Sequence, residues 1–450
     1  MKAKLKKLTY KQLPWLVTGI LSFIVSLGVL GQETKTWEAT ASYKSNPQVT
    51  IHLYDTHAEI LPVKEDKIVV QIEYVAEGDN SDALAKLEQA MKTELLKQDG
   101  NSITINTNFY SNLKSWSLFG FGEQNYVVLK DGNKLKFDDF TFEIKKLRIY
   151  LPSEMELNID GKYGKIDVLF SVHGDLNFEA YDLDFVGKSI AGKLKVDAKY
   201  SKIRFDKVGE ARLVLYETRF GATEMGNADI DSKYSQIETT TCGGLNYLGY
   251  EDKMAITKLP AAKMEAKYCN IRLGDVPNIK ANMYEGSLNL KKTNTLDLNA
   301  KYLEVDAINL KSLKMMEGYE NKILIESVDS LISINGKYNN VEIQNLSSYV
   351  KMDGYEEEVK ISSVNEAFTS LLFDGKYLEL NLTISKNAAY RFKGVVNYPE
   401  FRFLREEYKI IYHDKDSDFL KYDYLYGKID NPTKLIQING YEVNLTLNNL

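Results

Sequence analysis

The residue types that most often carry enzymatic chemistry are few in this chain and scattered along it. The four histidines, His52, His57, His173 and His413, show neither an HExxH pattern nor the spacing of metal ligands. No GxSxG, phosphate-binding glycine loop, dinucleotide-binding motif or calcium-binding nonapeptide occurs. The sequence therefore predicts no catalytic residue, no cofactor and no metal site, and we expect His52 and His57 to be polar strand residues.

Carboxylates are abundant, with 63 Asp and Glu residues, so a paired acid and base of the glycosidase kind is compatible with the composition. A carbohydrate-active β-helix enzyme, a lyase or a hydrolase, is therefore one alternative. Such an enzyme should gather carboxylates and basic residues in a groove over a few turns. In this sequence a repeat spreads the charged positions evenly, which favours a structural surface and a protein that is not an enzyme.

The chain is organised by a short repeated phrase with a small residue at its centre. Six consecutive steps of the repeat are 17 residues long, between Ala198 and Ala300. A short fixed period of this kind is typical of a stacked solenoid, because no single unit can bury its own apolar face. The small or apolar centres of the phrase fall at positions 161, 180, 198, 215, 232, 249, 266, 283, 300, 318, 336, 354 and 375.

Apolar residues alternate on both sides of this centre, which we number position zero. They precede it by four and two residues, as in Ile332 and Ile334, and follow it by five and seven, as in Ile203 and Phe205. The apolar positions are even-numbered up to zero and odd-numbered from five onward, so the chain must turn a corner between them. Stacked rungs would pair as parallel strands about 4.8 Å apart. The pattern predicts an all-β protein, a parallel β-solenoid with rungs of about 17 residues, right-handed by the rule for parallel crossovers.

Two outward columns follow position zero. The first alternates Lys with Tyr, and the second alternates Tyr with Asp or Glu. Alternation doubles the spacing of like charges to roughly 9.6 Å and sets each Lys diagonal to an acid, so we expect a charged lattice that fixes the register. A regular file of aromatic rings is also a candidate surface for a glycan or an envelope protein, formed by Tyr200, Tyr216, Tyr234, Tyr250, Tyr268, Tyr284 and Tyr302.

The two ends of the chain depart from the repeat. Residues 1–31 carry five lysines before an apolar run and resemble a cleaved signal peptide, with a retained membrane anchor as the alternative. This predicts an exported protein, in the periplasm, on the outer surface or outside the cell, that meets a membrane only through this segment.

Within 32–156 we expect strands and one capping helix, begun near Asn80 and ended by Gly100, with Leu87 and Met91 on its apolar face. Trp116 and Phe119 lie in an aromatic stretch that either packs into this cap or forms a contact loop. Regular repeats occupy 157–386.

The segment 387–450 is dense in aromatic residues and restores one repeat at its end. It is therefore predicted to be a C-terminal cap with a last rung, and Tyr412 is a candidate partner contact.

Cys242 falls in an inward slot and Cys269 at the corner, which argues against a disulfide. The net charge of -6 is mixed in sign along the chain, so no nucleic-acid surface is expected.

With this register the chain resembles a putative-adhesin family of bacterial secreted β-solenoid domains, common in Bacteroidota. The resemblance is carried by the strand pair and helix between Val49 and Leu96 and by the rungs of the form φ-x-φ-x-small-Lys-Tyr-x-x-φ-x-φ. It implies an exported, non-catalytic solenoid that acts in adhesion or as a cell-envelope scaffold. Alternatives are the carbohydrate-active enzyme described above and a polymer built by stacking of solenoid ends.

Overall fold

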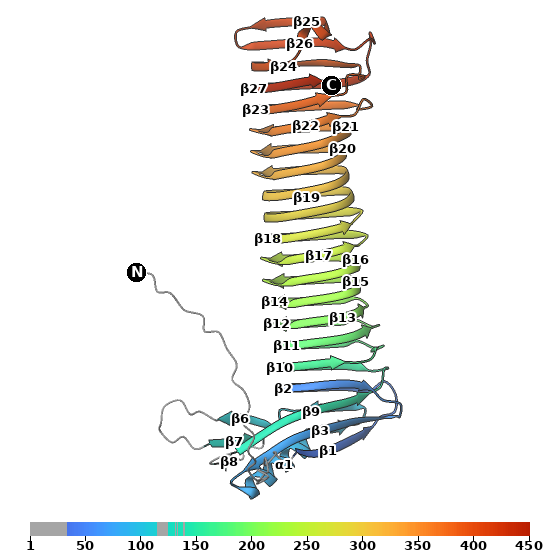
Figure 1. Cartoon of the computed structure of the whole chain (residues 1–450), viewed down its shortest axis with the longest axis vertical. Coiled ribbons are helices and arrows are strands. Elements are labelled where there is room, and N and C mark those ends of the chain that lie inside the picture. The colour runs from blue at the N-terminus through green and yellow to red at the C-terminus, as the bar shows by residue number, and fades with distance from the viewer. Residues whose placement is uncertain (1–33, 115–124, 131, 133, 138–139) are drawn as a thin grey trace, which may run out of the picture.

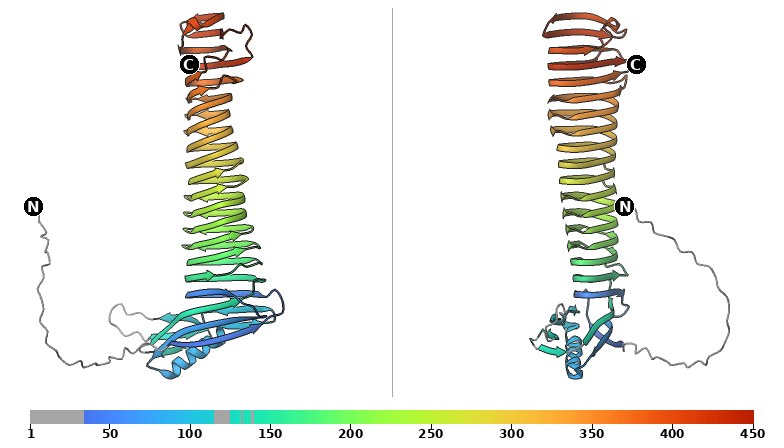
Figure 2. Two further views of the ribbon diagram at one scale, coloured as in Figure 1. Left: turned by 45° about the vertical axis from the view of Figure 1, so that its right-hand side comes forward. Right: turned by 60° about the vertical axis from the view of Figure 1, so that its left-hand side comes forward.

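The structure is a computed structural model that describes residues 34–114, 125–130, 132, 134–137 and 140–450. The predicted signal segment, Trp116 and Phe119 lie outside the described residues. The described chain forms a tall, straight tower of stacked strands with one helix at its N-terminal end (Figures 1 and 2). It is a parallel β-solenoid of about 13 turns whose equivalent residues lie about 18 positions apart, so the predicted fold class is confirmed.

The N-terminal end of the tower is built from an antiparallel sheet, a small hairpin sheet and the helix. Its elements are β1 (Thr34–Ser42), β2 (Gln48–Pro62), β3 (Lys67–Gly78), α1 (Ser81–Glu94), β4 (Leu96–Asp99), β5 (Ser102–Asn106), β6 (Tyr110–Lys114), β7 (Asn125–Leu129), β8 (Lys134–Phe137) and β9 (Phe140–Leu151). Strands β1, β3 and β9 pair in antiparallel fashion. β2 pairs in parallel with β5 and β9 on one side and with β10 (Glu156–Val168) on the other, so β2 is itself the first rung.

Helix α1 has the N-terminus that the sequence predicts but a different end. Asn80 is the N-cap, and its Oδ1 accepts the Ala83 N–H at 3.0 Å. Leu87 and Met91 are buried, which confirms the predicted apolar face. The helix ends at Glu94 rather than near Gly100, because β4 begins two residues later. Gly100 instead sits in the turn between β4 and β5 with φ +59°.

The central tower is formed by parallel strands that pair rung upon rung. After β10 these are β11 (Leu176–Ile190), β12 (Leu194–Lys199), β13 (Lys202–Val208), β14 (Ala211–Tyr216), β15 (Arg219–Lys233), β16 (Gln236–Tyr250), β17 (Lys253–Lys258), β18 (Ala261–Asp275), β19 (Asn278–Tyr319), β20 (Lys322–Lys337), β21 (Asn340–Tyr355), β22 (Glu358–Val364) and β23 (Ser370–Ile384). Each rung has two long sides that meet at the corner after position zero.

The C-terminal cap changes the order of the strands in space. It contains β24 (Tyr390–Arg402), the 3-10 helix η1 (Arg405–Glu407), β25 (Tyr408–Asp416), β26 (Phe419–Tyr426) and β27 (Lys434–Asn449). The last strand of the chain, β27, inserts in parallel between β23 and β24, and β24, β26 and β25 complete an antiparallel sheet. Buried aromatic side chains fill this cap, among them Tyr390, Phe392, Tyr422 and Tyr424.

The core follows the predicted inward columns, with one local exception. Ile203 and Phe205 are buried as predicted. The prediction that Ile332 and Ile334 point inward is wrong, because Leu331 and Ser333 occupy the core there instead. The β20–β21 pairing is irregular between Ser333 and Gly336, where β20 has one extra residue, and this shifts the alternation of buried and exposed side chains by one position. Asn335 lies in this bulge with φ +57°.

The corner two residues after position zero has an unusual backbone. In every rung this residue is a Tyr, Asp or Glu with φ between 46° and 59°, the left-handed region. For Tyr and Glu this conformation costs about 1 kcal/mol each, whereas Asp, like Asn, tolerates it better. The same strain therefore recurs along the whole tower, and other interactions must offset it.

The acidic corner residues should be replaceable with a gain in stability. Asn tolerates a left-handed backbone better than Glu, so Glu285→Asn should raise the free energy of unfolding by about 0.5–1 kcal/mol in urea denaturation. Tyr268→Asn relieves the same backbone strain but removes two ring contacts, so it should lower stability by about 1–2 kcal/mol. Equal effects of the two changes would contradict this account.

Candidate functional site

The predicted tyrosine columns form one continuous file of rings along the corner, which we call the tyrosine ladder. Fifteen contacts join sixteen rings, with centroids 5.2–5.8 Å apart and interplanar angles of 71–84°. In spatial order the members are Tyr54, Tyr163, Tyr181, Tyr200, Tyr216, Tyr234, Tyr250, Tyr268, Tyr284, Tyr302, Tyr319, Tyr338, Tyr355, Tyr377, Tyr441 and Tyr398.

The alternation of the two columns explains the geometry of this ladder. Identical positions in every rung would stack the rings at the strand spacing of about 4.8 Å. Moving the ring by one residue from rung to rung staggers the file, so each ring meets its neighbours edge to face, the arrangement that aromatic quadrupoles favour. Each contact contributes about 0.5–1.5 kcal/mol, and an interior ring makes two. This offsets the backbone strain at the tyrosine corners.

The predicted charged lattice differs from what the structure shows. Among the described residues, no ion pair within 4.0 Å joins a corner Lys to a corner Asp or Glu; the ion pairs of the tower lie elsewhere, such as Lys202 with Asp184 and Lys207 with Glu224. The corner acids instead act on the ring beside them. Glu320, hydrogen-bonded to the adjacent phenol, raises the pKa of Tyr319 to about 12. At the corner, rings therefore contact rings from rung to rung, and no ion pair between a corner Lys and a corner acid among the described residues supports the register.

The seven tyrosines named as a candidate surface all belong to the ladder, and Tyr412 does not. Tyr200, Tyr234 and Tyr302 are exposed to more than 40%, whereas Tyr250 is half-buried. Tyr412 lies on β25 at the far end of the cap, exposed, with the Lys421 Nζ 5.5 Å from its ring centroid. Trp116 and Phe119, which lie outside the described residues, are not placed by the structure. The ladder is therefore the part of the predicted surface that the fold brings together.

Sequence reasoning missed a second file of interactions, on the inner side of the same corner. The residue three positions after position zero, called position three, is buried. In four successive pairs of rungs its side-chain oxygen accepts a hydrogen bond from the backbone N–H of position three in the previous rung. The pairs are Leu183 to Ser201 Oγ (3.1 Å), Ser201 to Thr218 Oγ1 (3.3 Å), Thr218 to Ser235 Oγ (3.1 Å) and Ser235 to Asp252 Oδ1 (2.7 Å). A signal was present, because these polar residues share the parity of the apolar positions five and seven.

This inner polar column resumes three rungs further on and ends at a buried acid. Leu303 N–H donates to Asn321 Oδ1 at 3.0 Å, Asn321 Nδ2 to Asn339 Oδ1 at 2.8 Å, and Asn339 Nδ2 to Glu357 Oε1 at 2.9 Å. Glu357 Oε2 is buried without a hydrogen-bond partner among the described residues, and the next rung places Leu378 in the column. Burial raises the pKa of Glu357 to about 7.

Both cysteines are buried and free. Cys242 occupies the predicted inward slot, whereas Cys269 belongs to the inner column, where its Sγ receives the Asp252 N–H at 3.5 Å. Tyr247 reaches the same place from the core, and its hydroxyl donates to Asp252 Oδ2 at 2.8 Å. Burial raises the pKa of both thiols and of the Asp252 carboxyl. A protonated thiol is a poor nucleophile, so this cluster serves packing and hydrogen bonding.

The histidines of β2 lie on opposite sides of the corner. His52 Nδ1 lies 3.4 Å from Asp160 Oδ2, and His57 Nε2 lies 3.0 Å from Asp167 Oδ2, both on the next rung. Across the described residues, no group of three or more His, Cys, Asp or Glu side chains is arranged to hold a metal ion. No helix in the described part is both long and apolar enough to cross a membrane.

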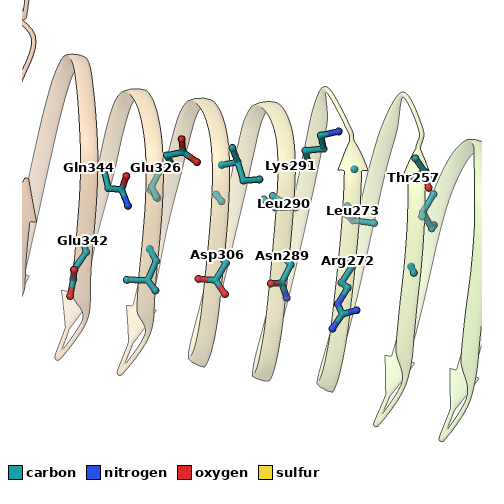
Figure 3. Close-up of a pocket in the computed structure, with 17 residues that line it drawn as sticks. Thr257, Arg272, Leu273, Asn289, Leu290, Lys291, Asp306, Glu326, Glu342 and Gln344 are labelled. Carbon is teal, nitrogen blue, oxygen red and sulfur yellow. The ribbon is translucent and has the colours of Figure 1, made fainter. Parts of the chain in front are cut away.

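Two of the shallow grooves along the tower bear on the candidate surface. One, here called the corner furrow, has a volume of about 690 Å³ and runs beside the ladder between Asp231 and Glu317. The other, the second-face groove, has about 780 Å³. Figure 3 shows its side chains in two rows across successive rungs, one with Arg272, Asn289, Asp306 and Glu342 and the other with Thr257, Lys291, Glu326 and Gln344.

The second-face groove contains the carboxylates and basic residues that a carbohydrate-active enzyme requires, but it is open to solvent. Asp306 and Glu342 lie in one column two rungs apart, which is roughly 9.6 Å between backbones. That spacing approaches the separation of inverting glycosidase carboxylates, about 6.5–9.5 Å. Asp306 is exposed, however, and general acids of this class are made from carboxyl groups surrounded by apolar side chains.

No protein-family model, no curated protein and no solved structure matches the chain at a significant level.

Stability should depend on pH through Glu357. Because its folded pKa of about 7 exceeds the ordinary value of 4.5, the stability it contributes is complete below pH 4.5 and is lost as the pH rises through 7. The loss should approach about 3 kcal/mol. Glu357→Gln should remove most of this dependence in urea denaturation at a series of pH values.

A matched control is the next residue. Glu358 is exposed and accepts a hydrogen bond from Asn340 Nδ2 at 2.7 Å. Glu358→Gln should leave the pH dependence in place. If both variants retain it, Glu357 is not its source.

Proposed function

We propose that this protein is an exported, non-catalytic rod that acts in adhesion or as a scaffold at the cell envelope. The observation that carries the proposal is the tyrosine ladder, an unbroken aromatic ridge that runs along the tower from Tyr54 to Tyr398. Aromatic rings with one apolar face and a polar hydroxyl are well suited to binding glycans and proteins at low entropic cost.

The closed ends of the tower support a rod of fixed length. At the N-terminal end, α1 and the antiparallel strands cover the first rung. At the other end, the buried aromatic residues of β24 and β26 close the core. A polymer built by stacking of solenoid ends would need an uncovered apolar core at each end. These caps therefore favour a single rod over end-to-end stacking.

The basic and apolar residues near the N-terminus, together with the resemblance to the putative-adhesin family, support export. An adhesin does not need a closed active site, and the shallow, repetitive grooves fit a binding surface. The second candidate function, a carbohydrate-active enzyme, is favoured by the mixed carboxylates and basic residues of the second-face groove.

The test is binding without turnover. The purified protein should be retained on a bacterial envelope preparation or on a glycan array, and the same samples should yield no new reducing ends. Substituting the exposed rings together, as Tyr234→Ala with Tyr302→Ala, should weaken retention by roughly tenfold, because two aromatic contacts are lost. Tyr412→Ala, at the far end of the cap, is the matched control and should leave retention unchanged.

Two results would overturn the proposal. New reducing ends that disappear in Asp306→Asn and Glu342→Gln variants would establish the enzymatic alternative. Loss of retention in Tyr412→Ala but not in the double ladder variant would place adhesion on the cap instead.

A further inference from the structure

The corner furrow lies directly beside the tyrosine ladder and has two chemically different banks. One bank is the column immediately before position zero, and the other is the column immediately after it. The floor is the backbone of the small residues between them, among them Gly249, Ala266 and Ala300. The furrow is therefore long, narrow and parallel to the axis of the tower.

The charges of the two banks cancel. Three carboxylates, Asp231, Glu265 and Glu317, line the first bank, and three ammonium groups, Lys233, Lys267 and Lys301, line the second. A strongly charged polymer would meet equal attraction and repulsion along its length. The chemistry therefore suits an uncharged, polar ligand whose hydroxyl groups accept from ammonium groups and donate to carboxylates.

Two amides, two rings and the exposed apolar side chain of Leu248 add to the charged residues of the two banks. Asn299 Nδ2 donates to Asn282 Oδ1 at 3.1 Å, which ties two rungs of the first bank together. On the second bank, Tyr250 and Tyr284 are each wedged between two ladder rings, with centroid distances of 5.4–5.7 Å. Their orientation is fixed before any ligand arrives, so binding costs little side-chain entropy.

The second bank repeats along the tower with a period of two rungs, roughly 9.6 Å, because Lys alternates with Tyr there. The carboxylates of the first bank are two rungs apart from Asp231 to Glu265 and three rungs apart from Glu265 to Glu317. Asp160 with Lys162 and Asp374 with Lys376 show that the two columns continue far beyond the stretch from 231 to 317. A compact ligand gains nothing from such a repeat, whereas a straight polymer with a matching repeat gains contacts with every unit.

Resting on the adhesive function proposed above, we infer that the corner furrow binds an uncharged, linear, ribbon-like polysaccharide that lies along the axis of the tower. β-1,4-linked glycans have this straight form, and each monosaccharide advances by a length close to one rung. The Lys and acidic banks hydrogen-bond the hydroxyl groups at the ribbon's edges, and the rings of Tyr250 and Tyr284 contact its apolar faces.

The experiment measures the affinity of the purified protein for cello-oligosaccharides from disaccharide to octasaccharide. Affinity should rise roughly tenfold between disaccharide and hexasaccharide and change little between low and high salt. Polygalacturonate, an anionic polymer, is the comparison probe.

Matched variants locate the site without disturbing the ladder. Asn282→Ala with Lys267→Ala should weaken binding by roughly tenfold, since two polar contacts are removed. Asn289→Ala with Lys291→Ala removes the same residue types from the second-face groove and should leave affinity unchanged.

Three outcomes would overturn the inference and leave the adhesive rod intact. The first is preferential binding of polygalacturonate with a steep salt dependence, and the second is an affinity independent of chain length. The third is retention on envelope preparations with no oligosaccharide bound, which would point to a protein partner. Absence of retention on any envelope or glycan surface would instead sink the proposed function itself.

Discussion

The corner of the rung is the constraint on which the rest of the tower depends. At each turn the chain passes through a left-handed residue that is a Tyr, Asp or Glu rather than Gly. The turn carries backbone strain and takes the position-three N–H groups of Leu183 and Ser201, among others, away from backbone acceptors. Two files of side chains compensate. The tyrosine ladder offsets the strain outside, and the inner polar column satisfies N–H groups inside.

The tyrosine ladder and the inner polar column extend over different lengths of the tower, and their chemistry explains the difference. The edge-to-face ladder tolerates contact with water and extends over the full height of the tower, from Tyr54 to Tyr398. The inner column is buried, so each member must have a partner, and the column stops where one is missing. At Glu357 the buried carboxylate is left with one unsatisfied oxygen, which couples the stability of the tower to pH.

Much of this could be predicted from the sequence because the period is short and regular. The repeat gave the all-β solenoid, the inward slot of Cys242 and the tyrosine columns. The parity error at Ile332 and Ile334 arose because a bulge adds one residue without a sequence signal as strong as Gly or Pro. The insertion of β27 between β23 and β24 is a long-range pairing that local periodicity does not encode. The edge-to-face contacts required side-chain geometry, since spacing alone equally suited an ion-pair lattice.

The central claim is that neighbouring rings of the ladder are energetically coupled and thereby hold the ridge rigid. A double-mutant cycle with Tyr250→Leu and Tyr268→Leu tests it most directly, with the free energy of unfolding in urea as the readout. The account predicts a favourable coupling of about 0.5–1.5 kcal/mol. A parallel cycle between Tyr250 and Tyr338, five rungs apart and roughly 24 Å distant, should give none. A coupling in the contacting pair no larger than in the distant pair would contradict the account.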